Sequence, residues 1–432
     1  MIFVVPLSRL SEIKADLSDA TPSLRTRFNP ALGTFLLLIG LNLLNFVDRY
    51  ILPGAQPLIQ REFHATDQQM GALTTAMFFF YMLAAPLTGW LGDRFNRKPL
   101  IIAGAILWSL ATLGTVWVHG YWTFYMRQAF VGIGEATFSI FAPSVLADFY
   151  PERERNRILS IFYIAIPVGA ALGYLAGGEM GSIWGWRTPF FVCAIPGLVI
   201  AALYAGFGRE PVRGSSDHLR ATADRATVLG LFRNPAFLTA TMGLATLTFA
   251  MGGISAWVPT FLHRTVGLSV ANSSLTVGAI TVVDGIAGTL TGGWLAQVWL
   301  RTNYRALYLL SFWSVVLTLP CGAMIFFGPR AWAIPSLFAA EFFLFLNTGP
   351  INTAIVNSVS APVRATAISI NLFCIHFFGD TFSPQIIGAI SDHSNLSIGL
   401  GATLIFLVIS AVILRAGVRF APPLEEQAQS AA

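Results

Sequence analysis

Seven long stretches of the chain contain no Asp, Glu, Lys or Arg, and this feature constrains the fold more than any other. They cover residues 68–92, 99–118, 158–178, 188–208, 234–262, 306–329 and 394–414. A transmembrane helix needs roughly 20 mainly apolar residues, so each stretch is long enough to cross a bilayer. The chain is therefore expected to be a membrane protein.

Five further stretches are apolar but carry isolated charged residues. They are 28–60 with Asp48 and Arg49, 121–147 with Arg127 and Glu135, 265–300 with Asp284, 331–363 with Glu341, and 365–391 with Asp380. Strands of a membrane barrel would alternate apolar and polar residues over about ten positions, and these continuous runs do not. The sequence predicts an all-α membrane protein with twelve transmembrane helices.

Composition agrees with this class and excludes others. Hydrophobic residues make up 55% of the chain and charged residues 11%, whereas soluble proteins carry about 25% charged residues. Cys193, Cys321 and Cys374 lie far apart, with neither disulfide nor metal-ligand spacing, so no metal or cofactor is expected. The net charge of +5 comes mostly from arginines between the spans, which favours membrane orientation over nucleic-acid binding.

The distribution of basic residues predicts the orientation. If both termini share one side, that side holds twenty of the 26 Lys and Arg residues, and the other side holds only Arg61, Arg187, Arg264 and Arg330. Basic loops concentrate in the cytoplasm, so both termini are expected there. The expected organisation is a cytoplasmic tail at 1–27, a six-helix bundle at 28–208, a cytoplasmic linker at 209–233, a second six-helix bundle at 234–420 and a tail at 421–432.

Short matches indicate that the second bundle repeats the first. The tripeptide Gly-Trp-Leu at 89–91 recurs at 293–295, and a pattern of Arg, Ser and Ile that begins at Arg155 recurs from Arg364. Duplicated six-span units are common in transporters. Numbered along the chain, spans three (99–118), six (188–208), nine (306–329) and twelve (394–414) contain no charged residue. These spans are therefore expected to face the lipid, with the charged spans around a central cavity.

Several motifs resemble a known family. Residues 89–98, Gly-Trp-Leu-Gly-Asp-Arg-Phe-Asn-Arg-Lys, resemble the signature cytoplasmic loop of the major facilitator superfamily. Within it, the spinster family is similar at 45–50 (Asn-Phe-Val-Asp-Arg-Tyr), 132–136 (Gly-Ile-Gly-Glu-Ala), 166–174 and 376–384. The resemblance covers about residues 40–395. It implies a proton-coupled carrier that works by alternating access, and animal members of the family export lysolipids and sphingosine-type phosphate lipids.

The resemblance also implies roles for charged residues of the first bundle. Asp48 and Glu135 would couple proton movement to transport. The chemistry of the residues adds that Arg49, a guanidinium beside an acid at membrane depth, is suited to bind an anionic headgroup. Structural alternatives remain open, because Asp48 and Arg49 could form an end-of-helix pair that snorkels to the interface. Arg127 and Glu135 could likewise be a structural pair that holds spans four and one together.

Other charged residues have two interpretations each. Arg127 or His376 could meet the same headgroup, and His376 could share a hydrogen bond with Asp380 one turn away. That pair fits a structural role as well as it fits substrate binding. Asp284 and Glu341 lie near no motif, so each could be a second protonation site or a satisfied interior carboxyl group.

A cytoplasmic gate is expected around the loop after the second span. Asp93 can pair with an arginine of 153–157 or cap a helix, which would hold the halves together. A plain basic loop would explain the cations of this region but not Asp93. The predicted gate comprises Gly89, Asp93, Arg94, Arg97, Lys98, Arg153, Arg155 and Arg157.

The leading hypothesis is a proton-coupled secondary transporter of amphipathic, anionic, lipid-like molecules, acting as a monomer among the lipids of the plasma or inner membrane. A general organic-anion or drug–proton antiporter is the alternative within transport. A hydrophobic lateral opening would favour lipids, and an enclosed polar cavity would favour small solutes. A membrane lipid enzyme is disfavoured because HExxH, GxSxG and P-loop motifs are absent, so no catalytic residue is assigned. Composition alone leaves a non-transporting receptor open.

Overall fold

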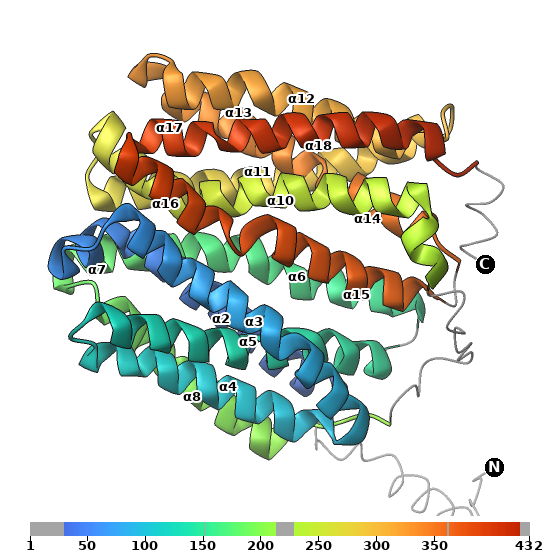
Figure 1. Ribbon diagram of the computed structural model, residues 1–432. Helices are drawn as coiled ribbons and strands as arrows, with labels where there is room; N and C mark the ends of the chain where they lie inside the picture. The colour runs from blue at the N-terminus through green and yellow to red at the C-terminus, as the bar shows by residue number, and fades with distance from the viewer. Residues whose placement is uncertain (1–29, 151, 213–228, 361–362, 424–432) are drawn as a thin grey trace, which may run out of the picture.

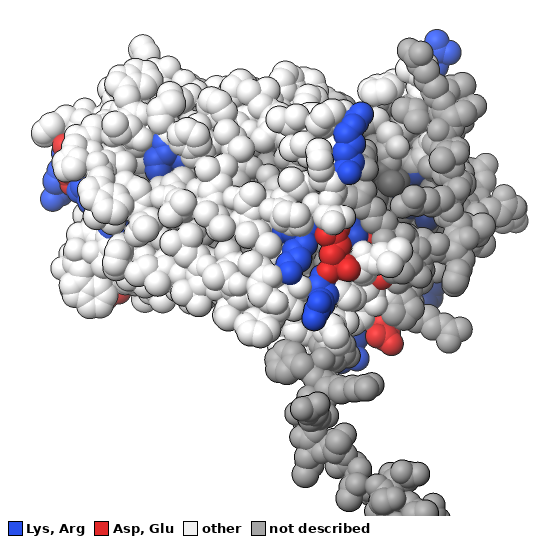
Figure 2. Space-filling model, turned by 90° about the horizontal axis from the view of Figure 1, so that it is seen from below, with Lys and Arg blue, Asp and Glu red and all other residues white. Residues whose placement is uncertain are grey.

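The computed structural model describes residues 30–150, 152–212, 229–360 and 363–423, without the side chains at positions 93, 152, 153, 156 and 365. All regular structure in these ranges is helical (Figure 1). Charged side chains gather toward the two ends of the face shown in Figure 2, with a broad and mostly uncharged band between them. Such a band is what a protein presents to the hydrocarbon of a bilayer.

The helices before the polar segment at 209–233 form the first half of the molecule. They are α2 (Pro30–Phe63), α3 (Asp67–Arg94), α4 (Arg97–Gly114), α5 (Tyr121–Phe149), α6 (Glu152–Leu175), which continues through the π-helical segment η2 (Ala176–Met180) into α7 (Gly181–Trp184), and α8 (Thr188–Phe207). Here α2 packs on α6, α3 on α5, and α4 on α5 and α8.

The second half follows the same plan with more interruptions. It contains α10 (Pro235–Phe261) with η4 (Leu262–Val266), α11 (Val270–Leu300), α12 (Ala306–Phe327), α13 (Ala333–Leu346), α14 (Thr348–Asn357), α15 (Arg364–Ile375), η7 (His376–Asp380), α16 (Ser383–His393), α17 (Leu396–Gly401) and α18 (Thr403–Gly417). Here α10 packs on α18, and α12 packs on α13 and α18.

Eleven helices of the described chain are long and apolar enough to cross a membrane. They correspond to eleven of the twelve predicted stretches, and 365–391 is the exception. That stretch forms α15 and α16, separated at Gly379, whose φ of −102° and ψ of −107° are not helical. A Cβ at Gly379 would lie 2.9 Å from the carbonyl oxygen of Ala245, so glycine allows both the break and the close approach to α10.

The most extensive contacts between the halves are those of α3 with α16 and of α6 with α11, and α2 also packs on α10. We call the end of the molecule at which α18 ends, toward the marked chain termini at the right of Figure 1, the terminal end, and the opposite end the far end. At the far end the helices touch closely, because a Cβ added at Gly71 of α3 would lie 2.2 Å from the carbonyl oxygen of Pro384 in α16.

The hydrophobic cores show where the halves are joined. One core, at the far end, combines residues of both halves, including Ile51, Phe124, Trp257 and Ile387. Each of the other two cores belongs to one half, and both extend toward the terminal end. The described molecule is therefore closed at the far end and divided toward the terminal end.

Candidate functional site

Two ion pairs lie deep inside the first half. A guanidinium nitrogen of Arg49 lies 2.6 Å from Oε2 of Glu135, and one of Arg127 lies 3.1 Å from Oδ1 of Asp48. Each pair joins α2 to α5. The alternative of a structural pair between Arg127 and Glu135 is not what the structure shows, because these two residues bond to different partners.

The two pairs differ in exposure. Glu135 is fully buried, and its Oε1 has no hydrogen-bond partner among the described residues. Asp48 and Arg127 are also buried, with Thr112 donating a hydrogen bond to Asp48. Only Arg49 of these four charged residues lines the central cavity. The pair of Arg49 and Glu135 therefore connects the interior of the first half to the space between the halves.

The central cavity has a volume of about 260 Å³ and lies between the halves. Its lining comes from both halves: Arg49, Tyr50, Phe78, Tyr174, Thr248, Met251, Gly252, Ile254, Ser255, Thr281, Glu341, Leu344, Phe345 and Asp380. None of these residues belongs to α4, α8, α12 or α18, the charge-free spans that the sequence places at the periphery. Arg127 is also absent from the lining, although the sequence made it a candidate for substrate binding.

Aromatic rings surround the guanidinium of Arg49. Its central carbon lies 5.1 Å from the ring centre of Phe46, 5.3 Å from that of Phe78 and 5.8 Å from that of Tyr81. Rings at these distances attract a cation and exclude water around it. A desolvated guanidinium is well suited to bind an anionic group in a forked geometry.

His376 and Asp380 lie at the two ends of η7 in the second half. The hydrogen bond expected across one turn is present, with Nδ1 of His376 2.9 Å from Oδ1 of Asp380. The imidazole ring stacks on Phe78 of α3, with 6.0 Å between the ring centres. Asp380 lines the central cavity, whereas His376 lines a second pocket. This pair therefore separates the two spaces and contacts the first half.

The second pocket opens between α3 and α15 and has a volume of about 310 Å³. Its lining is largely apolar: Tyr81, Met82, Ala85, Pro86, Gly89, Ile140, Ser369, Leu372, Phe373 and His376. Gly89, a predicted gate residue, has no atom near the position of an added Cβ. Leu83 and Leu87 of α3, and Ile368 of α15, are exposed. An apolar surface thus extends along both helices.

The basic loop after α3 makes its described contacts within the first half. Arg97 is buried and lies 2.7 Å from a carboxylate oxygen of Asp148 at the end of α5. The carboxylate of Glu210 accepts hydrogen bonds from the backbone N–H groups of Arg97 and Lys98 and so caps the start of α4.

The structure describes some of the other predicted gate residues. Arg94 lies over the ring of Trp90, with 4.0 Å to its centre. Arg157 is exposed and Arg155 is partly buried. The side chains of Asp93 and Arg153, the remaining charged residues of the predicted gate, lie outside the described part.

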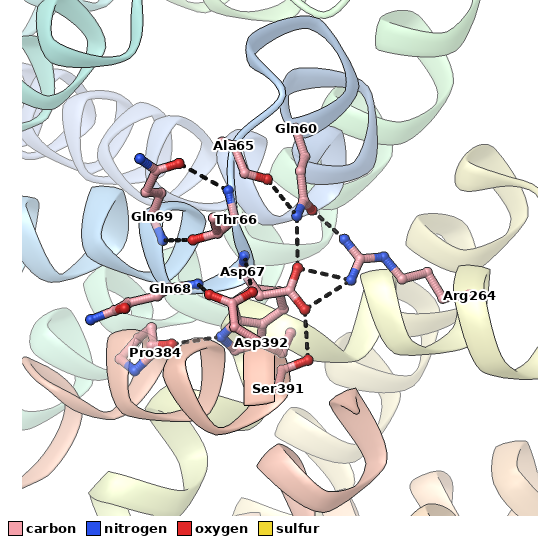
Figure 3. A network of polar contacts seen from close by, with 11 residues as sticks. Gln60, Ala65, Thr66, Asp67, Gln68, Gln69, Arg264, Pro384, Ser391 and Asp392 are labelled. Atoms are coloured by element: carbon pink, nitrogen blue, oxygen red, sulfur yellow. Dashed lines mark hydrogen bonds and ion pairs between the residues drawn. The ribbon is translucent and has the colours of Figure 1, made fainter. Parts of the chain in front are cut away.

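A polar network at the far end joins the halves, and sequence reasoning missed it (Figure 3). Arg264 of η4 donates hydrogen bonds of 2.9 and 3.0 Å to the two carboxylate oxygens of Asp67, the first residue of α3. Gln60 also bonds to both residues. Ser391 of α16 donates to Asp67, 2.6 Å away.

Asp392 completes this network, which we call the far-end latch: Gln60, Asp67, Arg264, Ser391 and Asp392. Its carboxylate accepts hydrogen bonds of 2.8 and 2.9 Å from the backbone N–H groups of Asp67 and Gln68. These groups have no partner within α3, because they belong to its first turn. A residue of the second half therefore caps a helix of the first.

Two acids of the second half, Glu341 and Asp284, lie inside the molecule. Among the described residues, no group of three or more His, Cys, Asp or Glu side chains could hold a metal ion. Glu341 lines the central cavity and accepts a 3.0 Å hydrogen bond from Thr281. Asp284 is fully buried on α11.

Comparison with known proteins supports the resemblance seen in the motifs. The family model of the Major Facilitator Superfamily matches residues 38–384. Protein spinster homolog 1 of Xenopus laevis is 34% identical over 383 residues, covering 83% of this chain and 72% of that protein. A sphingosine-1-phosphate transporter of Xenopus tropicalis is 32% identical over 374 residues, covering 83% of this chain and 73% of that protein.

A solved structure shares the fold. It is a bacterial homolog of the human lysosomal transporter spinster, in an inward-facing and unoccupied conformation. It matches with a TM-score of 0.81 at 23% identity, over 92% of this chain and 98% of that one. Together with the membrane-spanning helices and the cavity between the halves, these relations identify the chain as a multi-pass membrane transporter of the spinster family within the Major Facilitator Superfamily.

Proposed function

We propose that this transporter moves amphipathic, lipid-like molecules with an anionic headgroup, and that protons drive it. The observation that carries this proposal is the apolar pocket between α3 and α15, which adjoins a cavity with one guanidinium. A molecule that places its headgroup at Arg49 can lay its apolar chain along this pocket. Small polar solutes would gain nothing from such a surface. The similar proteins add support, since one of them is named as a sphingosine-1-phosphate transporter.

Proton coupling follows from competition for Arg49. The guanidinium is held by Glu135 in the structure, and an anion in the cavity would compete for the same donors. If the anion takes Arg49, the buried carboxylate of Glu135 loses its counter-ion and gains a proton instead, because an unpaired buried charge is costly. Anion binding and protonation of Glu135 therefore occur together. Asp48 stays paired with Arg127 and supports the geometry of this site.

Alternating access is consistent with the way the halves are joined. The far end is closed by a shared core and the far-end latch, while separate cores extend toward the terminal end. Transport requires the opposite state, in which the far end opens and the terminal end closes. In this cycle, the predicted cytoplasmic gate at 89–98 and 153–157 would act when the terminal end closes.

The proposal also includes the spans, the orientation and the membrane of the protein. We take α15 and α16 together as the one remaining span, the eleventh in chain order, so that two six-helix bundles at 28–208 and 234–420 are joined by the linker at 209–233. The terminal end, which is rich in basic residues, would face the cytoplasm. The protein would act as a monomer in the plasma or inner membrane, without catalytic chemistry of its own.

Flux in proteoliposomes tests the proposal. Purified protein is reconstituted in liposomes, a pH gradient is imposed, and the movement of a fluorescent lysophospholipid is measured beside that of an uncharged amphiphile and a small organic anion. We expect flux of the anionic lipid that collapses when a protonophore removes the gradient. Flux of the small anion alone would favour the organic-anion antiporter, and a chemically altered lipid without net movement would indicate an enzyme.

A further inference from the structure

The two halves differ in whether their buried acids have a cationic partner. In the first half, Asp48 and Glu135 each have an arginine partner within 3.1 Å. In the second half, α10, α11, α12 and α13 contain no Lys or Arg at all. Two acids nevertheless lie inside them, Asp284 on α11 and Glu341 on α13.

Asp284 is the most isolated acid of the described chain. Its exposed fraction is 0%, and neither carboxylate oxygen has a hydrogen-bond partner among the described residues. Keeping an ionised carboxylate in such a place is far more costly than binding a proton. The surroundings of Asp284 are therefore those of a neutral carboxylic acid.

Glu341 connects this acid to the cavity. Its exposed fraction is 9%, it lines the central cavity, and it accepts a hydrogen bond from Thr281. Thr281 lies three residues before Asp284 on α11, so both point from the same face of that helix. Asp284 and Glu341 therefore occupy the same region between α11 and α13, with Glu341 on the cavity side.

The charged groups described around this region do not supply a counter-ion for Asp284 or Glu341. Across the cavity, Arg49 is bonded to Glu135, and His376 is bonded to Asp380. Of the other elements packed on α11 and α13, α10, α12 and α14 contain no Lys or Arg, and those of α6 lie in its first turns, up to Arg157. η5 (Arg330–Trp332), which packs on α13, carries Arg330, whose side chain is exposed. At the far end, η2 carries Glu179, and Arg264 of η4 is bonded to Asp67.

We propose that Asp284 and Glu341 form a second proton site, separate from Glu135, that is loaded in the state described and exchanges protons with the cavity through Glu341. Release of a proton from the Glu341 carboxyl group to water in the cavity would leave a carboxylate facing the cavity and a hydronium ion in that water, and the reverse transfer neutralises the carboxylate again. The part of the inference that concerns transport rests on the proposed function. The protonation itself does not.

Infrared spectroscopy of the purified full-length protein in lipid nanodiscs at neutral pH tests the site without any transport. The C=O stretch of a protonated carboxyl group is distinct from the bands of a carboxylate. We expect Asp284→Asn and Glu341→Gln each to remove such a signal from the parent spectrum. Glu62→Gln is the control, because Glu62 is exposed and paired with Arg187. Unchanged protonated-carboxyl bands in both variants would show that the acids are ionised, and loss in only one of them would overturn the shared site.

Thermal stability is a second test, which does not depend on assigning infrared bands to particular carboxyl groups. Asp284→Asn replaces a neutral acid by a neutral amide, so we expect a Tm close to that of the parent. Asp48→Asn removes the counter-ion of buried Arg127, so we expect a clear fall in Tm. Equal falls in the two variants would mean that Asp284 is charged and partnered, which contradicts the proposal.

Transport then measures the role of the site. In the flux assay, we expect Glu341→Gln to carry fewer protons for each cargo molecule than the parent. An unchanged ratio in a variant with active flux would overturn the coupling role. Absence of cargo flux in the parent would instead argue against the proposed function, and the infrared result would stand.

Discussion

Replacing Arg264 by alanine should open the far end of the transporter. Arg264 bridges the halves through two hydrogen bonds to Asp67, and its side chain is 35% exposed. A charge-assisted hydrogen bond contributes about 1.5–3 kcal/mol when it is buried, and an exposed ion pair contributes about 0.2–1 kcal/mol. Because this pair is only partly exposed, we estimate that Arg264→Ala removes about 1–2 kcal/mol from the closed far end.

That free energy sets the size of the expected shift. A change of one to two kcal/mol alters the ratio of two states by about 5- to 30-fold. The contacts of Asp67 with Ser391, and of Asp392 with the first turn of α3, remain in the variant. The far end should therefore open more often rather than come apart in every molecule.

Distances between spin labels at the far end measure this shift. Labels at Arg61 and Ser394, which are exposed in the first and second halves, are placed in a background without Cys193, Cys321 and Cys374. Double electron–electron resonance should show a larger population at long distance in Arg264→Ala than in the parent.

Arg187→Ala is the matched control. Arg187 also donates to both oxygens of a carboxylate at the same end, through two guanidinium nitrogens, but its partner Glu62 lies in the same half. If Arg187→Ala shifts the distances as much as Arg264→Ala does, the far-end latch has no special role in holding the halves together.

Three further changes test the site itself. Glu135→Gln fixes the neutral form of the acid beside Arg49, so distances between the halves should lose their pH response while the protein stays folded; a response like that of the parent would contradict this. Arg49→Lys keeps the charge but loses the forked geometry, so binding of anionic amphiphiles should weaken by about tenfold or more, whereas equal losses for uncharged amphiphiles would indicate a structural role. Arg97→Gln breaks contacts within the first half, so Tm should fall while label distances between the halves stay unchanged; altered distances would assign it to the gate.

The sequence predicts much of this architecture because a bilayer imposes simple rules. Eleven of the expected spans appear at the predicted places, since the required length and apolarity are visible in single stretches. The break at Gly379 was not predicted, although an isolated glycine and the Ser383-Pro384 pair that starts α16 are visible signals.

The partners of the buried charges could not be read from the sequence. Asp48 and Arg49 are neighbours in the chain, which suggested that they act as a pair. On a helix, successive side chains point about 100° apart, so Asp48 turns into the first half toward Arg127 and Arg49 turns to Glu135 and the cavity. Such choices depend on how helices are packed, which no local pattern contains.

The far-end latch was missed for a similar reason. Arg264 was counted only as a loop charge, and its partner Asp67 lies 197 residues away. The capping box of Thr66 and Gln69, which marks the start of α3, was a local signal that Asp67 occupies the first turn. Nothing in the chain near Asp67 reveals that Asp392, 325 residues later, caps the same turn.

The ion pairs within the first half differ in burial and strength from the latch between the halves. The buried pairs of Arg49, Arg127 and Arg97 all lie within the first half, and removing one partner of such a pair costs about 3–5 kcal/mol. The latch between the halves is partly exposed and weaker. A ligand shifts a two-state equilibrium only by its difference in affinity for the two states. In the proposed transport cycle, weak contacts between the halves would therefore let a proton or a cargo molecule of modest affinity open the far end, whereas strong ones would hold it closed.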